Sequence, residues 1–222
     1  MDKNRPGAVQ SGHAEGMIME EMTVNACMPG FGASCALCCG SHNCDATPEE
    51  MAEVYRKRRE IISLYRRDYL VKRVMASRSD MTGSYYFTGR NDVELPGLPS
   101  LFGEKRCPFI GFHETGGLIG CLLNRGVESS LRYECFNNYS SKNFTCAAKE
   151  NLGGDEIVFA AMLCRDWYYY PLLIHRPETL ARLMRDWGDP DAVPDEVLEK
   201  TKVFLRSEAR QDVTLHRMLS YF

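Results

Sequence analysis

Ten cysteines in a chain of 222 residues constrain this sequence more than any other feature. Five lie between positions 27 and 44, four between positions 107 and 146, and Cys164 stands apart. Their even number admits a disulfide framework. Against it, the first residues contain no apolar export signal, and the chain is long enough to build a core without covalent staples. We therefore expect the cysteines to bind a metal in the reducing cytoplasm.

The first cysteine group contains the unit Cys35-Ala-Leu-Cys38, followed at once by Cys39. The Cys-x-x-Cys spacing lets two thiolates converge on one metal while nearby backbone N–H groups donate to sulfur. Neighbouring side chains diverge in an extended backbone, so Cys38 and Cys39 can ligate one centre only if the loop curls. Further candidate ligands nearby are Cys27, Cys44 and His42.

The second group begins with Cys107-Pro-Phe, continues through Gly120-Cys121 and reaches Cys135 after Arg132. Cys146 follows and competes with Cys135 as a ligand. Glycine, asparagine and serine surround these cysteines, which favours irregular loops over long helices. Cys164 instead lies inside an apolar helical pattern and is expected to be a buried free thiol.

The order Cys-x-x-Cys-Cys, Cys-Pro-Phe, Gly-Cys and a cysteine after an arginine resembles the YkgJ-type cysteine-cluster family. The resemblance covers about residues 27–146 and implies a zinc- or iron-chelating domain. Proteins related to flagellin lysine methylation share the cluster. The matching positions are Cys35, Cys38, Cys39, Cys107, Cys121 and Cys135. The sequence departs from the family pattern where Gly32 replaces a cysteine, a place that Cys27 or Cys44 would fill.

Many cysteines and only five histidines fit thiolate ligation, which suits either an iron–sulfur cluster or a Cys₄ zinc site. A single Cys-x-x-Cys unit lacks the paired knuckles of a zinc ribbon. Because four ligands suffice for one [4Fe–4S] cluster, we favour iron–sulfur and keep zinc as the alternative. Such a metal would join two loops that are far apart in sequence, so a purely structural role is the plainest alternative.

The predicted fold is mainly α with irregular cysteine-rich loops, a small metal-centred core and C-terminal helices. Residues 1–22 are expected to be a flexible lead-in, 23–150 a cysteine-cluster metal-binding domain, and 151–222 a helical segment packed on it. Helices are predicted from Thr47 to about residue 80, over 155–170, over 177–187 and over 194–219, with a short strand at 85–87. Phe204 and Leu205 are core candidates in the last helix.

Charge is distributed unevenly along a chain whose net charge is −3. Between Arg56 and Arg78, nine basic residues face only Glu60 and Asp68, which leaves +7. This basic helix suggests nucleic acid or another acidic partner, although a solvated face is the favoured interpretation. No apolar run reaches the length of a membrane span. A second hypothesis is an enzyme or accessory factor in protein methylation, for which no methyl-donor site is visible. A third is an interaction module that binds nucleic acid or a protein partner and holds a structural metal.

Overall fold

The computed structural model describes residues 24–64, 85–88, 92–99, 101, 109–113, 117–122 and 146–211. This part of the chain is mainly helical, as predicted. Its helices are α1 (Pro48–Leu64), α4 (Ala147–Asn151), α5 (Gly154–Cys164), α6 (Tyr169–Ile174), α7 (Pro177–Trp187) and α8 (Asp195–Gln211), with 3-10 turns η1 (Leu37–Cys39) and η2 (Pro190–Ala192). Strands β1 (Tyr85–Thr88) and β2 (Asp92–Leu95) form one antiparallel pair, and β3 (Ile110–Phe112) and β4 (Ile119–Cys121) form another. The predicted lead-in, residues 1–22, lies outside the described residues.

Helix α1 begins where the sequence predicts. The Thr47 N–H donates to a Glu50 carboxylate oxygen at 2.8 Å, and the Glu50 N–H donates to the Thr47 hydroxyl at 3.2 Å. Two N–H groups that the helix leaves without partners are thereby satisfied. Met51 and Tyr55 from its inner face are each 1% exposed, and this face packs on β3. The predicted end of the helix near residue 80 falls outside the described residues.

The helix predicted over residues 155–170 is confirmed only as far as Cys164, because the chain then breaks and a second helix follows. α5 ends at Cys164, and Arg165 then adopts a left-handed conformation with φ 52°. α6 begins at Tyr169 and contains Pro171 in its first turn. Backbone N–H groups in a first turn have no partner within the helix, so a proline there removes no hydrogen bond and does not end the helix.

The sequence correctly predicts where α7 ends and closely predicts where α8 begins. α7 ends at Trp187, and Gly188 after it has φ 69°, as expected of a terminating glycine. α8 begins close to the predicted start, and its Leu205 is buried. Phe204 was predicted to lie in the core, but it is 44% exposed because it falls on the outer face of α8. Residues 212–219 of the predicted helix lie outside the described residues.

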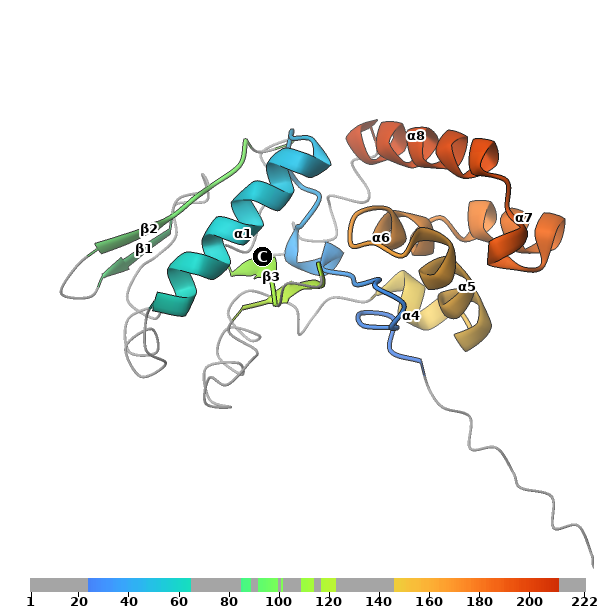
Figure 1. Cartoon of the computed structure of the whole chain (residues 1–222), viewed down its shortest axis with the longest axis horizontal. Coiled ribbons are helices and arrows are strands. Elements are labelled where there is room, and N and C mark those ends of the chain that lie inside the picture. Colours follow the sequence, from blue (N-terminus) through green and yellow to red (C-terminus); the bar gives the residue numbers. More distant parts are fainter. Residues whose placement is uncertain are drawn as a thin grey trace, which may run out of the picture.

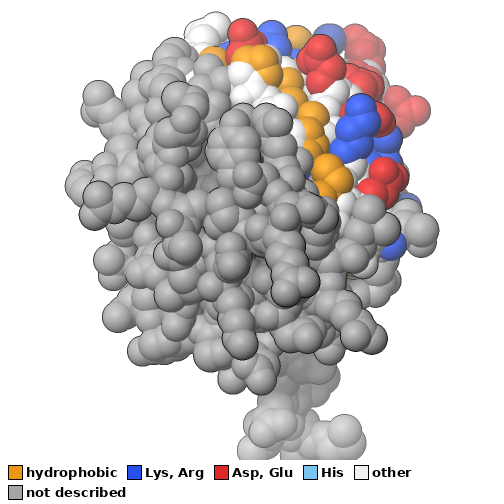
Figure 2. Space-filling view, turned by 90° about the vertical axis from the view of Figure 1, so that its left-hand side faces the viewer, with side chains coloured by type: hydrophobic (Ala, Val, Ile, Leu, Met, Phe, Trp, Pro, Cys, Tyr) orange, Lys and Arg blue, Asp and Glu red, His pale blue; other side chains and the backbone are white. Residues whose placement is uncertain are grey.

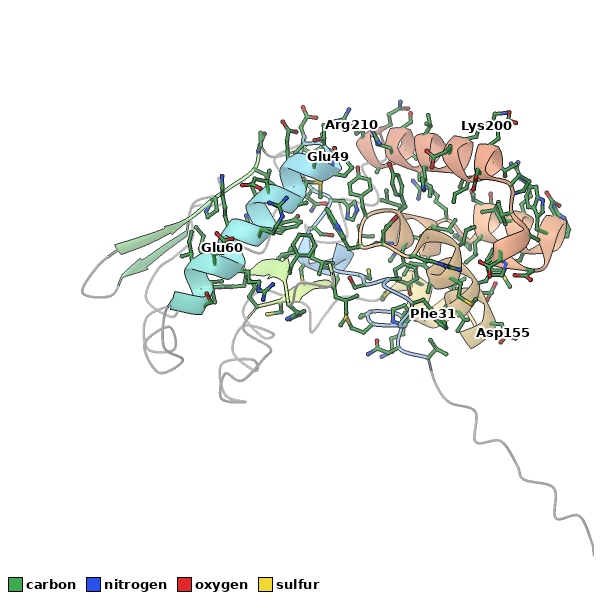
Figure 3. The ribbon with its side chains drawn as sticks, in the orientation of Figure 1. Phe31, Glu49, Glu60, Asp155, Lys200 and Arg210 are labelled. Atoms are coloured by element: carbon green, nitrogen blue, oxygen red, sulfur yellow. The ribbon has the colours of Figure 1, made fainter. Side chains whose placement is uncertain are left out.

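One buried cluster joins the N-terminal cysteine loop, α1, the β3–β4 pair and the C-terminal helices. The segment 24–47 lies between α1 and the helices α4 to α6 (Figure 1). Trp167, between α5 and α6, packs edge-on against Tyr55 and Phe112 with ring centroids 5.6 and 5.5 Å away. Trp167 is thus packed against the core. Figure 3 shows Arg210 near the start of α1, where its guanidinium lies 3.5 Å from the Asp45 carboxylate.

Across the described ranges, no helix is both long enough and apolar enough to cross a membrane.

Candidate metal centre

The first cysteine loop is shaped by a tight reversal at residues 30–32, all of which have positive φ. The Cys35 N–H donates to the Cys27 carbonyl at 2.9 Å, so the two ends of the reversal lie side by side. Gly32 has φ 79°, and a Cβ there would lie 3.2 Å from the Arg165 carbonyl oxygen. A cysteine at this position would be strained, whereas the reversal brings Cys27 next to Cys35.

The vicinal pair lies on the short turn η1, which ends at Gly40 with φ 77°. The turn curls the chain, so the Sγ atoms of Cys38 and Cys39 are 4.0 Å apart. Cys39 also packs against the hydrophobic core. The Cys39 thiol holds the pKa of the Cys38 thiol below its usual range by hydrogen bonding to it, and burial acts in the opposite direction. The Cys38 thiol therefore ionises more readily than an ordinary cysteine.

Four thiols from two distant stretches are close enough to influence one another electrostatically. Burial raises the pKa of Cys27 to about 11, with the charges of Cys38 and Cys146 adding to the effect. Burial also raises the pKa of Cys35, and the charges of Cys38, Cys27 and Cys146 raise it further. Cys146 immediately precedes α4, more than a hundred residues after this loop. The fold thus gathers Cys27, Cys35, Cys38 and Cys146 around one region.

Helix α6 holds the loop against Cys146. The Tyr170 hydroxyl is buried and donates to the Ala26 carbonyl at 2.8 Å, next to Cys27. His175 caps the C-terminal end of the same helix, and its Nε2 lies 3.8 Å from the Cys146 Sγ. Burial lowers the pKa of His175, so the neutral ring is favoured. α6 is therefore the element that links the two parts of the cysteine cluster.

The Gly-Cys element of the second stretch meets the first loop through its backbone. The Ile119 N–H donates to the Ser34 hydroxyl at 2.8 Å, and both residues are fully buried. Ser34 directly precedes Cys35, and Cys121 follows at the end of β4. Gly120 has no room for a side chain, because a Cβ would overlap the His113 ring. The strand pair thus holds Cys121 on an element anchored beside the first loop.

Cys44 and His42, two further candidate ligands of the first cysteine group, form hydrogen bonds with other protein atoms. Cys44 is buried and its thiol points to the Ser41 carbonyl oxygen at 3.7 Å. His42, a predicted substitute for a thiolate, contacts the Ser41 hydroxyl through Nδ1 at 2.8 Å and the Tyr168 carbonyl oxygen through Nε2 at 2.9 Å. Both of its ring nitrogens are therefore engaged by protein atoms. The predicted ligands outside the described residues are Cys107 and Cys135.

All eight cysteines that the structure describes are free thiols. Cys164 is among them, as predicted, but it is half-buried where the sequence predicted full burial. Burial raises the pKa of the Cys164 thiol, and the charge of Asp166 adds to this effect. Among the described residues, no three Cys, His, Asp or Glu side chains converge closely enough to hold a metal ion. The gathered thiols are thus near one another without forming a closed coordination sphere. Their chemistry nevertheless suits a thiophilic metal, because sulfur ligands are what zinc and iron–sulfur clusters prefer.

His175 and Tyr170 are the residues of this region that sequence reasoning missed. Neither lies near a cysteine in the sequence, and His175 follows an apolar helical segment. No sequence spacing could have pointed to them, because their position depends on how α6 packs against the first loop.

A scan against family models, a search of curated proteins and a search of solved structures each found no match to this chain.

Proposed function

We propose that this chain is a metal-binding protein that holds an iron–sulfur cluster or zinc through cysteine thiolates. Cys35 and Cys38 from the first loop are central to the site, joined by Cys27 and Cys146. Cys39, Cys107, Cys121 and Cys135 are further ligand candidates from the resemblance to the cysteine-cluster family. The metal serves electron transfer, metal handling or structure.

The observation that carries this proposal is the gathering of Cys27, Cys35, Cys38 and Cys146 from distant parts of the chain. Thiolates placed near one another repel, and here the charges of Cys38 and Cys146 raise the pKa of both Cys27 and Cys35. A bound cation offsets the repulsion between neighbouring thiolates, because its positive charge stabilises them. A thiol that coordinates a metal is therefore deprotonated outright. A fold that assembles free thiols in this way is therefore suited to binding a cation with them.

Two backbone contacts support the same interpretation. The Ser34–Ile119 hydrogen bond anchors the Gly-Cys strand beside the first loop, and the Tyr170–Ala26 hydrogen bond anchors α6 on its other side. Because the described side chains do not form a closed coordination sphere, metal binding requires these sulfurs to move toward one another. Metal–thiolate bonds contribute folding free energy of their own, so they can drive such a movement.

The test is anaerobic purification of the full chain, followed by measurement of iron, zinc and acid-labile sulfide per chain. Iron and sulfide in stoichiometric amounts identify a cluster, and stoichiometric zinc without colour identifies a zinc site. The paired variant Cys35→Ser, Cys38→Ser should lose the metal.

Cys164→Ser is the matched control, because Cys164 is also a free thiol packed against the core and does not belong to the gathered set. It should retain the metal of the unmodified chain. A chain that contains no stoichiometric metal, even after reconstitution under reducing conditions, would contradict the proposal.

A further inference from the structure

The ring of His175 has a defined hydrogen-bonding state. Its Nδ1 lies 2.8 Å from the Pro171 carbonyl oxygen, one helical turn back. A carbonyl oxygen can only accept, so Nδ1 must carry the proton of this hydrogen bond. In the neutral ring Nε2 is then left with its lone pair. Carbonyl groups in the last turn of a helix lack backbone partners within the helix. The Pro171 carbonyl can therefore accept a hydrogen bond from the His175 side chain.

The Nε2 atom with this lone pair points toward Cys146. It lies 3.8 Å from the Cys146 Sγ, and the His175 residue is only 8% exposed. Histidine ligands of metals commonly have this arrangement, with the second ring nitrogen donating to a carbonyl or carboxylate that fixes the tautomer and the ring plane. The Pro171 carbonyl supplies that contact here.

From this geometry we propose that His175 Nε2 is a metal ligand and that, with the Cys146 thiolate and two thiolates of the Cys27–Cys38 loop, it forms a Cys₃His site for a zinc-class divalent ion. The inference rests on the proposed metal-binding function and narrows it. Tetrahedral sites with three thiolates and one imidazole are typical of structural zinc, whereas a [4Fe–4S] cluster is ordinarily held by four thiolates. The imidazole thus favours zinc over the iron–sulfur cluster that the cysteine count alone suggests.

The fold places this imidazole beside the first loop through α6. Tyr170, in the same helix, donates to the Ala26 carbonyl at 2.8 Å, and Cys27 accepts from the Cys35 N–H at 2.9 Å. The helix that carries the ring therefore also fixes the loop that carries the thiols. The His175 ring and the Cys27–Cys35 turn are therefore both positioned by hydrogen bonds that involve α6.

The test uses the full chain, freed of metal under reducing conditions, then titrated with Co²⁺ and Zn²⁺. His175→Ala should bind Zn²⁺ at least tenfold more weakly in competition with a chelator, since even loss of an outer-shell partner weakens binding by about 10–100-fold. His175→Cys should bind Co²⁺ with visible bands at longer wavelength, because a fourth thiolate replaces the imidazole. His42→Gln is the matched control and should keep the affinity and spectrum of the unmodified chain, because His42 is similarly buried but has both ring nitrogens engaged.

A second measurement needs no substitution in the chain that binds the metal. In a chain with ¹⁵N-labelled histidine, Zn²⁺ should move the Nε2 resonance of His175 and leave that of His42 in place. If both His175 variants match the unmodified chain in affinity and spectrum, or if no histidine nitrogen responds to Zn²⁺, the inference is overturned while the proposed function stands. Iron and sulfide in the anaerobic protein would overturn the zinc assignment. A chain that binds no metal at all would overturn both.

Discussion

The hydroxyl of Ser34 accepts a 2.8 Å hydrogen bond from the backbone N–H of Ile119, and neither residue is exposed to solvent. This contact joins the loop of the first cysteine group to the strand of the second. A buried N–H without a partner costs about 1–3 kcal/mol, so Ser34→Ala should lower the free energy of unfolding by that amount. Guanidinium unfolding monitored by circular dichroism measures the change.

Ser63→Ala is the control for this measurement. Ser63 lies on the exposed side of α1, where its hydroxyl donates to the Glu60 carbonyl at 2.7 Å. Its replacement should change the free energy of unfolding by less than about 0.5 kcal/mol. Equal effects of the two substitutions would show that the Ser34 contact does not stabilise the junction.

Asp166 caps α6, because its carboxylate accepts from the backbone N–H groups of Tyr168, Tyr169 and Tyr170 at 2.8, 2.6 and 3.3 Å. Asp166→Ala should therefore lower the free energy of unfolding by about 0.5–2 kcal/mol, the usual range for a lost N-cap. Asp166→Asn retains an acceptor oxygen and should lose less. Thermal and chemical unfolding of the two variants measures the difference.

The same residue predicts a pH dependence. Burial raises the pKa of Asp166, although the three hydrogen bonds oppose the shift. Between the unfolded value of about 3.9 and the raised folded value, the folded chain binds more protons than the unfolded chain, so its stability falls as pH rises through this window. The stability of the unmodified chain relative to Asp166→Asn should therefore increase on acidification. A decrease would show that the hydrogen bonds outweigh burial.

Among the basic residues of α1 whose burial the structure describes, Arg58 is the one that does not face solvent. It is 4% exposed, and it donates to the carbonyls of Pro96 at 2.8 Å and Ile110 at 3.4 Å. Arg58→Leu would leave both acceptors without this donor and should lower the free energy of unfolding by about 1–3 kcal/mol. Arg56→Gln, at an exposed position of the same helix, should change it by less than about 0.5 kcal/mol.

A test of nucleic-acid binding must therefore use other positions. Arg56 and Lys57 are exposed, although both pair with Glu53. On the described part of the face in Figure 2, acidic and basic side chains lie next to one another, with hydrophobic side chains between them. We expect weak, salt-sensitive retention on heparin at most, unchanged in Arg56→Gln, Lys57→Gln. Strong retention that this paired variant abolishes would favour the acidic-partner hypothesis.

Metal binding should protect one set of thiols from alkylation. Coordination blocks the sulfur lone pairs, so Zn²⁺ should slow alkylation at Cys27, Cys35 and Cys146 and leave the rate at Cys164 unchanged. Mass spectrometry of peptides from a timed reaction with iodoacetamide measures each rate. Equal slowing at Cys164 would mean that the metal tightens the whole fold without binding these sulfurs.

The sequence alone determined the features that depend on neighbouring residues. The start of α1 at Thr47 follows from a local exchange of hydrogen bonds, and the end of α7 before Gly188 follows from the freedom of glycine to adopt positive φ. The cysteine count and the absence of an apolar leader disfavoured disulfides, and the described cysteines form none. Metal binding by these thiols stays a prediction. Rules based on neighbouring residues failed between α5 and α6. They do not reveal that Pro171 lies in the first turn of a new helix.

Only the tertiary structure decided which distant groups lie together. Cys146 belongs with Cys27 because α6 and α4 pack against the first loop, and no spacing along the chain encodes that packing. His175 lies beside Cys146 for the same reason, since its ring direction depends on one carbonyl of α6. A ligand set is a relation among side-chain directions in space, whereas a sequence gives only the order in which the ligands are attached.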